Sequence, residues 1–154
     1  MATIIGVITD AGREKWSKYM AGVVGIDDIA GGGFRIGEGG WINIPPKVPK
    51  SPNATLTDLD CIVNAGSYPV DSRYVFPTVG TKAFNSVLWV SPSIIRLECL
   101  LDFTDANDDG FGNPPEFWEL GVYDSAGVMV AYFTFPVDIK TVLNQLLYEI
   151  DIIF

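Results

Sequence analysis

The sequence contains no histidine and only two cysteines, Cys61 and Cys99. The absence of histidine removes the commonest general base and every Ser-His or Cys-His pair that could activate a nucleophile. Zinc would be left with two cysteines and carboxylates, which form a poor ligand set. The acidic residues lie in predicted loops and on predicted exposed strand faces, where nothing would keep one carboxyl protonated for glycoside hydrolysis. We therefore expect a protein that is not an enzyme.

Basic residues are also scarce, since ten Lys and Arg stand against 19 Asp and Glu and give a net charge of −9. This charge repels the phosphates of nucleic acids and anionic membranes, and no cluster of Lys and Arg offers a local exception. No stretch approaches the roughly 18 apolar residues of a transmembrane helix. The sequence thus predicts neither a nucleic acid partner nor a membrane span.

Signals for secretion and for disulfide bonds are missing as well. Met1-Ala2-Thr3 leads into an apolar strand without a charged leader, so we expect folding in the cytoplasm. The two cysteines lie far apart without C-x-x-C spacing, which predicts reduced and structurally inert thiols.

Apolar residues, in contrast, are abundant, at 48% of the 154 residues. A chain of this length suits one domain, 1–154, with a sizeable core. The apolar fraction is high for a soluble monomer, so we expect part of the surface to contact other protein. A well-filled β-rich core is the simpler alternative.

Strand patterns occupy most of the chain. Segments 86–90, 94–103 and 147–154 are predicted strands, and the second and third alternate in polarity as strands with one buried face do. Between them, 136–140 interrupts the β pattern and 141–146 is predicted to form one helical turn. We predict a mainly β fold, an antiparallel β-sandwich-like domain with one N-terminal α-helix (α+β).

The predicted helix runs from Thr9 or Asp10, which can cap its first free amides, to about Ala21. Glu14 and Lys18 are predicted to pair on its exposed side. The predicted buried stripe, spaced i, i+3 and i+4, consists of Trp16, Tyr19 and Met20.

The stretch 117–133 organises the rest of the chain and is predicted to form a β-hairpin. Residues 124–127 supply the turn, and the apolar run that returns from Val128 to Phe135 predicts a second arm buried on both faces. In the first arm, strict alternation predicts that one face is shared by Trp118, Leu120 and Val122.

Prolines dominate the segment 45–52, which reads Pro-Pro-Lys-Val-Pro-Lys-Ser-Pro. Such a segment is not expected inside a sheet, so we predict an extended, polyproline-like arm or long loop over about 43–54. A plain surface loop is the simpler interpretation. In a polymeric assembly, an arm of this kind lies along a neighbouring subunit.

Four segments together resemble a known family. Glu119-Leu120-Gly121-Val122-Tyr123-Asp124-Ser125-Ala126-Gly127 resembles the E-[IL]-G-[LV]-[FY]-D-x-x-G hairpin of the phage tail-collar fibre proteins, the N-terminal attachment domain of many tail fibres. Thr9-Asp10-Ala11-Gly12 with its helix resembles the family's T-N-A-G opening. Phe34-Arg35-Ile36-Gly37-Glu38-Gly39-Gly40 resembles its A-V-G-D-G-x-G strand and turn. Phe135-Pro136 and the strand 147–154 lie where that domain ends, so the segments occur in the family's order.

The resemblance implies a structural virion protein of a phage tail, a tail-fibre attachment, collar or baseplate component assembled in the host cytoplasm. It implies a homo-oligomer, a trimer because three-fold fibres need three-fold bases, that docks to other phage tail or baseplate proteins. It also implies that the strand 94–103 pairs with the hairpin that follows it. The residues expected at these interfaces are Trp41, Pro45, Pro46, Pro49, Trp89 and Phe154.

One segment has the pattern of a metal site, because 105–116 matches D-x-[DN]-x-[DN]-G-x5-E over its full length. Gly110 would allow the sharp turn. The predicted Ca²⁺ ligands are Asp105, Asn107, Asp109, the Phe111 carbonyl and Glu116. The flanks are predicted strands and Pro114-Pro115 cannot begin a helix, so a solvated acidic hairpin loop is the alternative.

A second function follows from this segment. If calcium binds, the chain could be a calcium-stabilised β binding module that recognises glycans through exposed Trp and Tyr, with Trp41 beside the glycine-rich turn. No cofactor is otherwise required.

Overall fold

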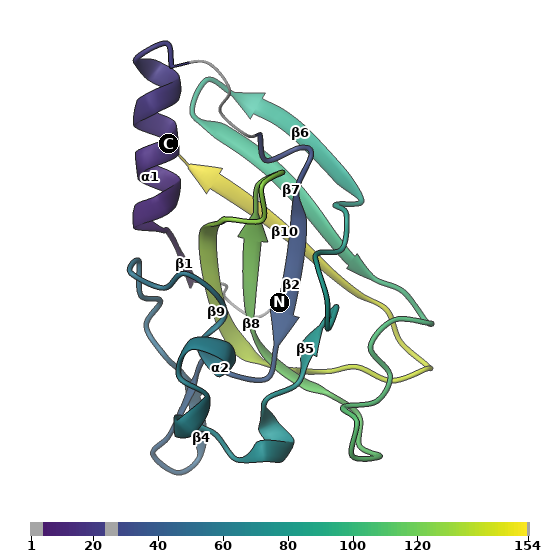
Figure 1. Cartoon of the computed structure of the whole chain (residues 1–154). Coiled ribbons are helices and arrows are strands. Elements are labelled where there is room, and N and C mark those ends of the chain that lie inside the picture. Colours follow the sequence, from purple (N-terminus) through teal and green to yellow (C-terminus); the bar gives the residue numbers. More distant parts are fainter. Residues whose placement is uncertain (1–4, 24–27, 154) are drawn as a thin grey trace.

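The computed structural model describes residues 5–23 and 28–153, whose two larger antiparallel sheets pack face to face beside a third sheet of two strands (Figure 1). The five-stranded sheet has the order β1 (Ile5–Ile8), β9 (Met129–Ile139), β8 (Glu116–Tyr123), β2 (Gly33–Gly37), β5 (Val75–Phe76). The three-stranded sheet has the order β10 (Leu146–Ile153), β7 (Ile94–Leu101), β6 (Ser86–Ser91). The predicted mainly β, sandwich-like fold with one N-terminal helix is confirmed.

The main core lies between these two sheets. Strand β7 alternates as predicted, with Leu97, Cys99 and Leu101 fully buried. Strand β10 does the same and faces the same core through Tyr148, Ile150 and Ile152. From the other side, the five-stranded sheet contributes Phe34, Ile36, Phe117, Leu120, Val122, Phe133 and Phe135.

A second core covers the opposite face of the five-stranded sheet. The segment 41–75 packs there through a two-stranded ribbon, the short helix α2 (Asp60–Val63) and two 3₁₀ turns (Ala65–Ser67 and Val70–Ser72). Its buried side chains meet those of β8 and β9: Trp41, Leu56, Leu59, Cys61, Tyr68 and Val75 against Trp118, Tyr123, Met129 and Tyr132. Because both faces of β9 are covered, its run from Met129 to Phe135 is buried throughout, as predicted.

The register of the hairpin corrects one prediction. Strands β8 and β9 shift register between Phe117 and Glu119. Phe117 therefore joins Leu120 and Val122 in the main core, whereas Trp118 belongs to the second core. The prediction that Trp118 shares a face with Leu120 is wrong because two-residue alternation holds only where the pairing is regular.

Helix α1 (Asp10–Met20) begins and ends close to the predicted positions. Thr9 caps it, since its side-chain oxygen accepts the Gly12 N–H at 3.1 Å, and the predicted Glu14–Lys18 ion pair is present at 2.6 Å. The predicted buried stripe is wrong: the exposed fractions are 39% for Trp16, 64% for Tyr19 and 67% for Met20. The buried residue of α1 is Gly12, in its first turn, so the rest of the stripe does not reach the sheet.

The proline-rich segment is not an extended arm. Strand β3 (Trp41–Asn43) pairs with β4 (Lys47–Pro49), with Trp41 opposite Pro49. Proline is tolerated because an isolated ribbon leaves outward N–H positions without a ladder partner. Lys50 ties the ribbon to the sheet, since its N–H donates to the Gly40 carbonyl at 2.8 Å and its carbonyl accepts the Thr134 hydroxyl at 2.7 Å.

Three further expectations are corrected. Strand β9 continues to Ile139 and is not interrupted at 136–140, because Pro136 falls where the β8–β9 register shifts and no ladder bond is lost. Residues 141–145 make a turn instead of the predicted helical turn, and Leu146 already begins β10, since the Asn144 side chain accepts the Thr141 N–H at 2.7 Å. Strand β7 pairs with β6 and β10, not with the hairpin.

Candidate protein interface

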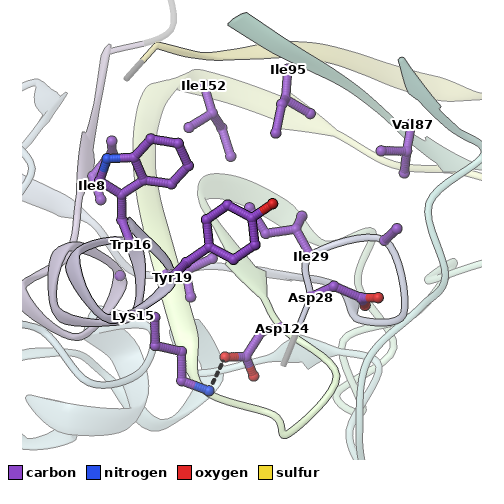
Figure 2. A pocket seen from close by; sticks show the side chains of 13 residues that line it. Ile8, Lys15, Trp16, Tyr19, Asp28, Ile29, Val87, Ile95, Asp124 and Ile152 are labelled. Atoms are coloured by element: carbon purple, nitrogen blue, oxygen red, sulfur yellow. Dashed lines mark ion pairs between the residues drawn. The ribbon is translucent and has the colours of Figure 1, made fainter. Parts of the chain in front are cut away.

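An apolar groove of about 370 Å³ separates α1 from the three-stranded sheet. Figure 2 shows Trp16 and Tyr19 projecting from α1 into this space, with Val87, Ile95 and Ile152 on the opposite wall. These wall residues come from β6, β7 and β10. The groove exists because the first turn of α1 contacts β9 while its later turns stand away from the sandwich.

An ion pair anchors the helix at the groove. The ammonium of Lys15 contacts the buried carboxylate of Asp124, as the dashed line in Figure 2 shows. The other oxygen of Asp124 accepts the N–H groups of Ala126 and Val128, both at 3.0 Å. Asp124 therefore shapes the β8–β9 turn and holds α1 to it, and Gly127 completes that turn with a φ of 79°.

Strand β6 continues this apolar surface. Its four central residues are all exposed, at 38% for Val87, 50% for Leu88, 74% for Trp89 and 43% for Val90. In the described part of the chain, β6 is the last strand of its sheet (Figure 1). An uncovered apolar edge strand is rare on a monomer, because its free backbone groups template further pairing.

We call the exposed side chains on this side the α1–β6 surface, which consists of Trp16, Tyr19 and Met20 from the helix and Val87 and Trp89 from the strand. Leu88, opposite Arg96, lies on the other face of β6. Of the predicted interface residues, the α1–β6 surface contains Trp89. The helical members were missed because their spacing predicts a buried stripe. The sequence signal that could have indicated this surface is the segment 86–91, whose four central residues are apolar without alternation. The structure shows that this segment lies at a sheet edge.

The other predicted interface residues lie elsewhere. Trp41 is buried in the second core, where it contacts Tyr68 edge-on with ring centroids 5.1 Å apart and donates its indole N–H to the Glu38 carbonyl. It is therefore unavailable to a glycan or partner. Pro45 and Pro46 are exposed between β3 and β4, and Pro49 is half-buried in β4. Phe154 lies outside the described residues.

A buried acidic cluster joins the second core to the sheet. Glu119 is fully buried, and its carboxylate accepts the N–H groups of Asp60 at 2.7 Å and Cys61 at 3.1 Å and the hydroxyl of Tyr132 at 2.6 Å. Burial raises the pKa of Glu119, although these donors act in the opposite direction. Glu119 is closed to solvent, so its evident role is to hold α2 against β8 and β9.

Asp60 extends this cluster toward the ribbon. Burial acts to raise its pKa, but the Lys50 ammonium at 2.7 Å and hydrogen bonds from Tyr68 and Asn64 outweigh burial and lower the pKa. The charged form of Asp60 is thus the stabilised one. The tyrosine also accepts the Gly40 N–H at 2.9 Å, which fixes the glycine-rich turn over the cluster.

Glu38 forms a second buried clamp at the end of β2. Its carboxylate oxygens accept the N–H of Tyr74 at 3.2 Å and the N–H of Glu116 at 3.0 Å. Burial raises the pKa of Glu38 to about 7, and the two backbone hydrogen bonds only partly oppose this shift.

This raised pKa predicts a pH dependence of stability. A carboxyl whose pKa rises on folding stabilises the protein below its unfolded pKa, and that contribution is lost as the pH rises through about 7. Between pH 5.5 and 8, we expect the free energy of unfolding of the unaltered protein, measured by urea denaturation, to fall by about 2 kcal/mol more than that of Glu38→Gln. Parallel pH profiles for the two proteins would contradict this assignment.

The predicted calcium ligands do not converge in the structure. Asp105 contacts the Lys82 ammonium and accepts the Asp102 N–H, while Asn107 accepts the Lys140 ammonium at 2.7 Å. Asp109 accepts the N–H groups of Phe111 and Asn113 within the loop, and Glu116 is exposed at the start of β8. Residues 5–23 and 28–153 contain no group of three or more His, Cys, Asp or Glu placed to hold a metal. Calcium binding stays a prediction, which melting curves with and without millimolar calcium test.

Both cysteines are free and buried, and burial raises the pKa of each thiol. In the part of the chain that the structure describes, no helix is long and apolar enough to cross a membrane. Comparison of the chain with protein-family models, with curated proteins and with solved structures finds no match.

Proposed function

We propose that this chain is a structural protein of a phage tail, a fibre-attachment, collar or baseplate component that acts by self-assembly and by docking to neighbouring tail proteins. The observation that carries the proposal is the α1–β6 surface, which exposes large apolar side chains on a protein with two filled cores. Monomers rarely leave such a surface uncovered, whereas assembly subunits need one.

The surrounding structure supports docking in two ways. The wall residue Ile152 is part of the main core and Ile95 packs against it, so this wall is preformed and little ordering is required on binding. Trp89 offers a large aromatic anchor, and burying such a side chain contributes roughly 2 kcal/mol or more. A net charge of −9 keeps the free subunit soluble before assembly.

The resemblance adds the location and a copy number to this proposal. The hairpin that carries it, residues 119–127, supplies the buried clamp Glu119 and the turn anchor Asp124. Asp124 anchors the helix that presents part of the surface, whereas Glu119 holds α2 against β8 and β9. By analogy with fibre proteins, the assembled form would be a trimer in the tail of the virion.

Electron microscopy with antibody-gold labelling tests the proposal on particles released by the culture that encodes this chain. We expect the label to concentrate at a tail end or collar. Unlabelled particles, with the protein confined to the soluble fraction, would contradict it. In that case, binding on a glycan array would favour the calcium-stabilised binding module.

A further inference from the structure

We infer that the free edge of β6 pairs antiparallel with β6 of a second copy of this chain, across a two-fold axis. The inference rests on the proposed assembly function and names the partner of one part of the α1–β6 surface. The pairing would join the three-stranded sheets of two copies into one continuous sheet.

The charge distribution favours a second copy as the partner. Each copy carries a net charge of −9, so two copies repel one another across most possible contacts. Residues 83–95 carry no charged side chain, and β6 lies within this neutral window. Beyond the window, Arg96 on β7 contacts the carboxylates of Asp151 at 2.7 Å and Glu149 at 3.6 Å, and the carboxylate of Glu98 accepts the Asn85 amide at 2.9 Å, so these charged groups are already engaged within one copy.

The edge also lacks the features that usually prevent such pairing. Natural edge strands are guarded by lysine, by proline or by a bulge. Residues 86–91 contain neither lysine nor proline. The β6–β7 register shift falls between Trp89 and Ser91, at the end of the strand, so the part from Ser86 to Trp89 is regular and available.

Symmetry restricts the register of this pairing. Directly opposed residues in an antiparallel pair are either both hydrogen-bonded to each other or both not. A two-fold axis therefore passes between two opposed residues, and these must be the same residue from the two copies. With Leu88 at the axis, Val87 of each copy lies opposite Trp89 of the other. Aromatic and β-branched side chains form favourable cross-strand pairs, and this register makes two of them. It covers Trp89, the most exposed residue of β6 at 74%.

A cysteine at the axis tests the pairing directly. In Leu88→Cys, the two introduced thiols would lie opposite one another, at a spacing that a disulfide can bridge. Cys61 and Cys99 are buried and should not react. The matched control is Leu143→Cys, at an exposed turn position away from β6. Under mild oxidation, intact mass should show at least ten times more covalent dimer for Leu88→Cys than for Leu143→Cys. Equal yields would overturn the inference.

The full-length chain with Trp89→Lys provides a second measurement. Sedimentation should show a self-association constant at least ten-fold weaker than that of the unaltered protein, with an unchanged melting temperature. Unchanged association would also overturn the pairing. A two-fold contact cannot close the trimer proposed above, so β6 pairing would join two single copies or two such trimers. A species of three copies only would contradict the pairing without contradicting the proposed function. If particles carry the gold label but Leu88→Cys does not cross-link, the β6 pairing is wrong and the proposed function stands. If Leu88→Cys cross-links but no particle is labelled, the pairing stands and the proposed function is wrong.

Discussion

Replacing Glu119 by alanine is expected to lower the free energy of unfolding by about 4 kcal/mol, or to prevent folding altogether. The change would strip three buried donors, the N–H groups of Asp60 and Cys61 and the Tyr132 hydroxyl, of their shared acceptor. Each unsatisfied buried donor costs roughly 1–3 kcal/mol. Removing a buried carboxylate gives back part of this loss, so the expected total lies below the simple sum.

Two companion variants separate this effect from a general effect of losing a glutamate. Glu116→Ala removes an exposed side chain from the same strand and should change stability by less than about 0.5 kcal/mol. Tyr132→Phe removes one of the three donors and with it the hydrogen bond from the Tyr132 hydroxyl to Glu119, and it should lower the free energy of unfolding by about 1 kcal/mol. Urea denaturation measures all three. If Glu119→Ala lowered the free energy of unfolding no more than Glu116→Ala does, the Glu119 carboxylate would not be what holds α2 and the second core against the sheet.

The second large effect is expected for Gly12→Ala. In an exposed helix, this change would stabilise by about 1 kcal/mol because alanine is the better helix former. Here a Cβ at position 12 would lie 2.3 Å from the Val130 carbonyl oxygen of β9. Backbone cannot yield as a flexible side chain can, so α1 must move off the sheet. We expect a loss of about 2 kcal/mol and a displaced groove wall.

Gly66→Ala is the matched control for that variant, because no atom lies within 4 Å of the Cβ it would add. It should leave stability and association unchanged. Thermal melting and sedimentation report the two quantities for both variants. A Gly12→Ala protein that is more stable than the parent would show that α1 does not approach β9 closely.

The parts of the fold that were predictable are those governed by local alternation. Strands β7 and β10 each have one face against the main core, so the alternation of apolar and polar residues in their sequences predicts which side chains are buried. Trp118 was misplaced because a register shift is set by the partner strand and leaves no mark in its own sequence. Similarly, the ribbon β3–β4 forms around prolines since its outer positions need no ladder bonds.

The candidate interface was predictable only in part, for a related reason. Trp89 follows from an apolar strand without alternation, but which strand lies at the edge depends on the order of the whole sheet. Trp16 and Tyr19 have the spacing of a buried stripe, and they are exposed because α1 approaches β9 through its first turn, where Gly12 is its buried residue. The calcium pattern in 105–116 was matched in sequence, yet Lys82 and Lys140, distant in sequence, contact two of its side chains.

The central claim is that the α1–β6 surface docks this chain into the tail, and incorporation into particles tests it most directly. Trp89→Lys and the control Leu143→Lys both place a charge at an exposed apolar position, but only Trp89 belongs to the α1–β6 surface. Each tagged variant would be expressed beside the unaltered protein, and its amount in purified particles measured by mass spectrometry. The account predicts that Leu143→Lys is incorporated normally and that Trp89→Lys falls at least ten-fold. Equal incorporation of the two variants would contradict it.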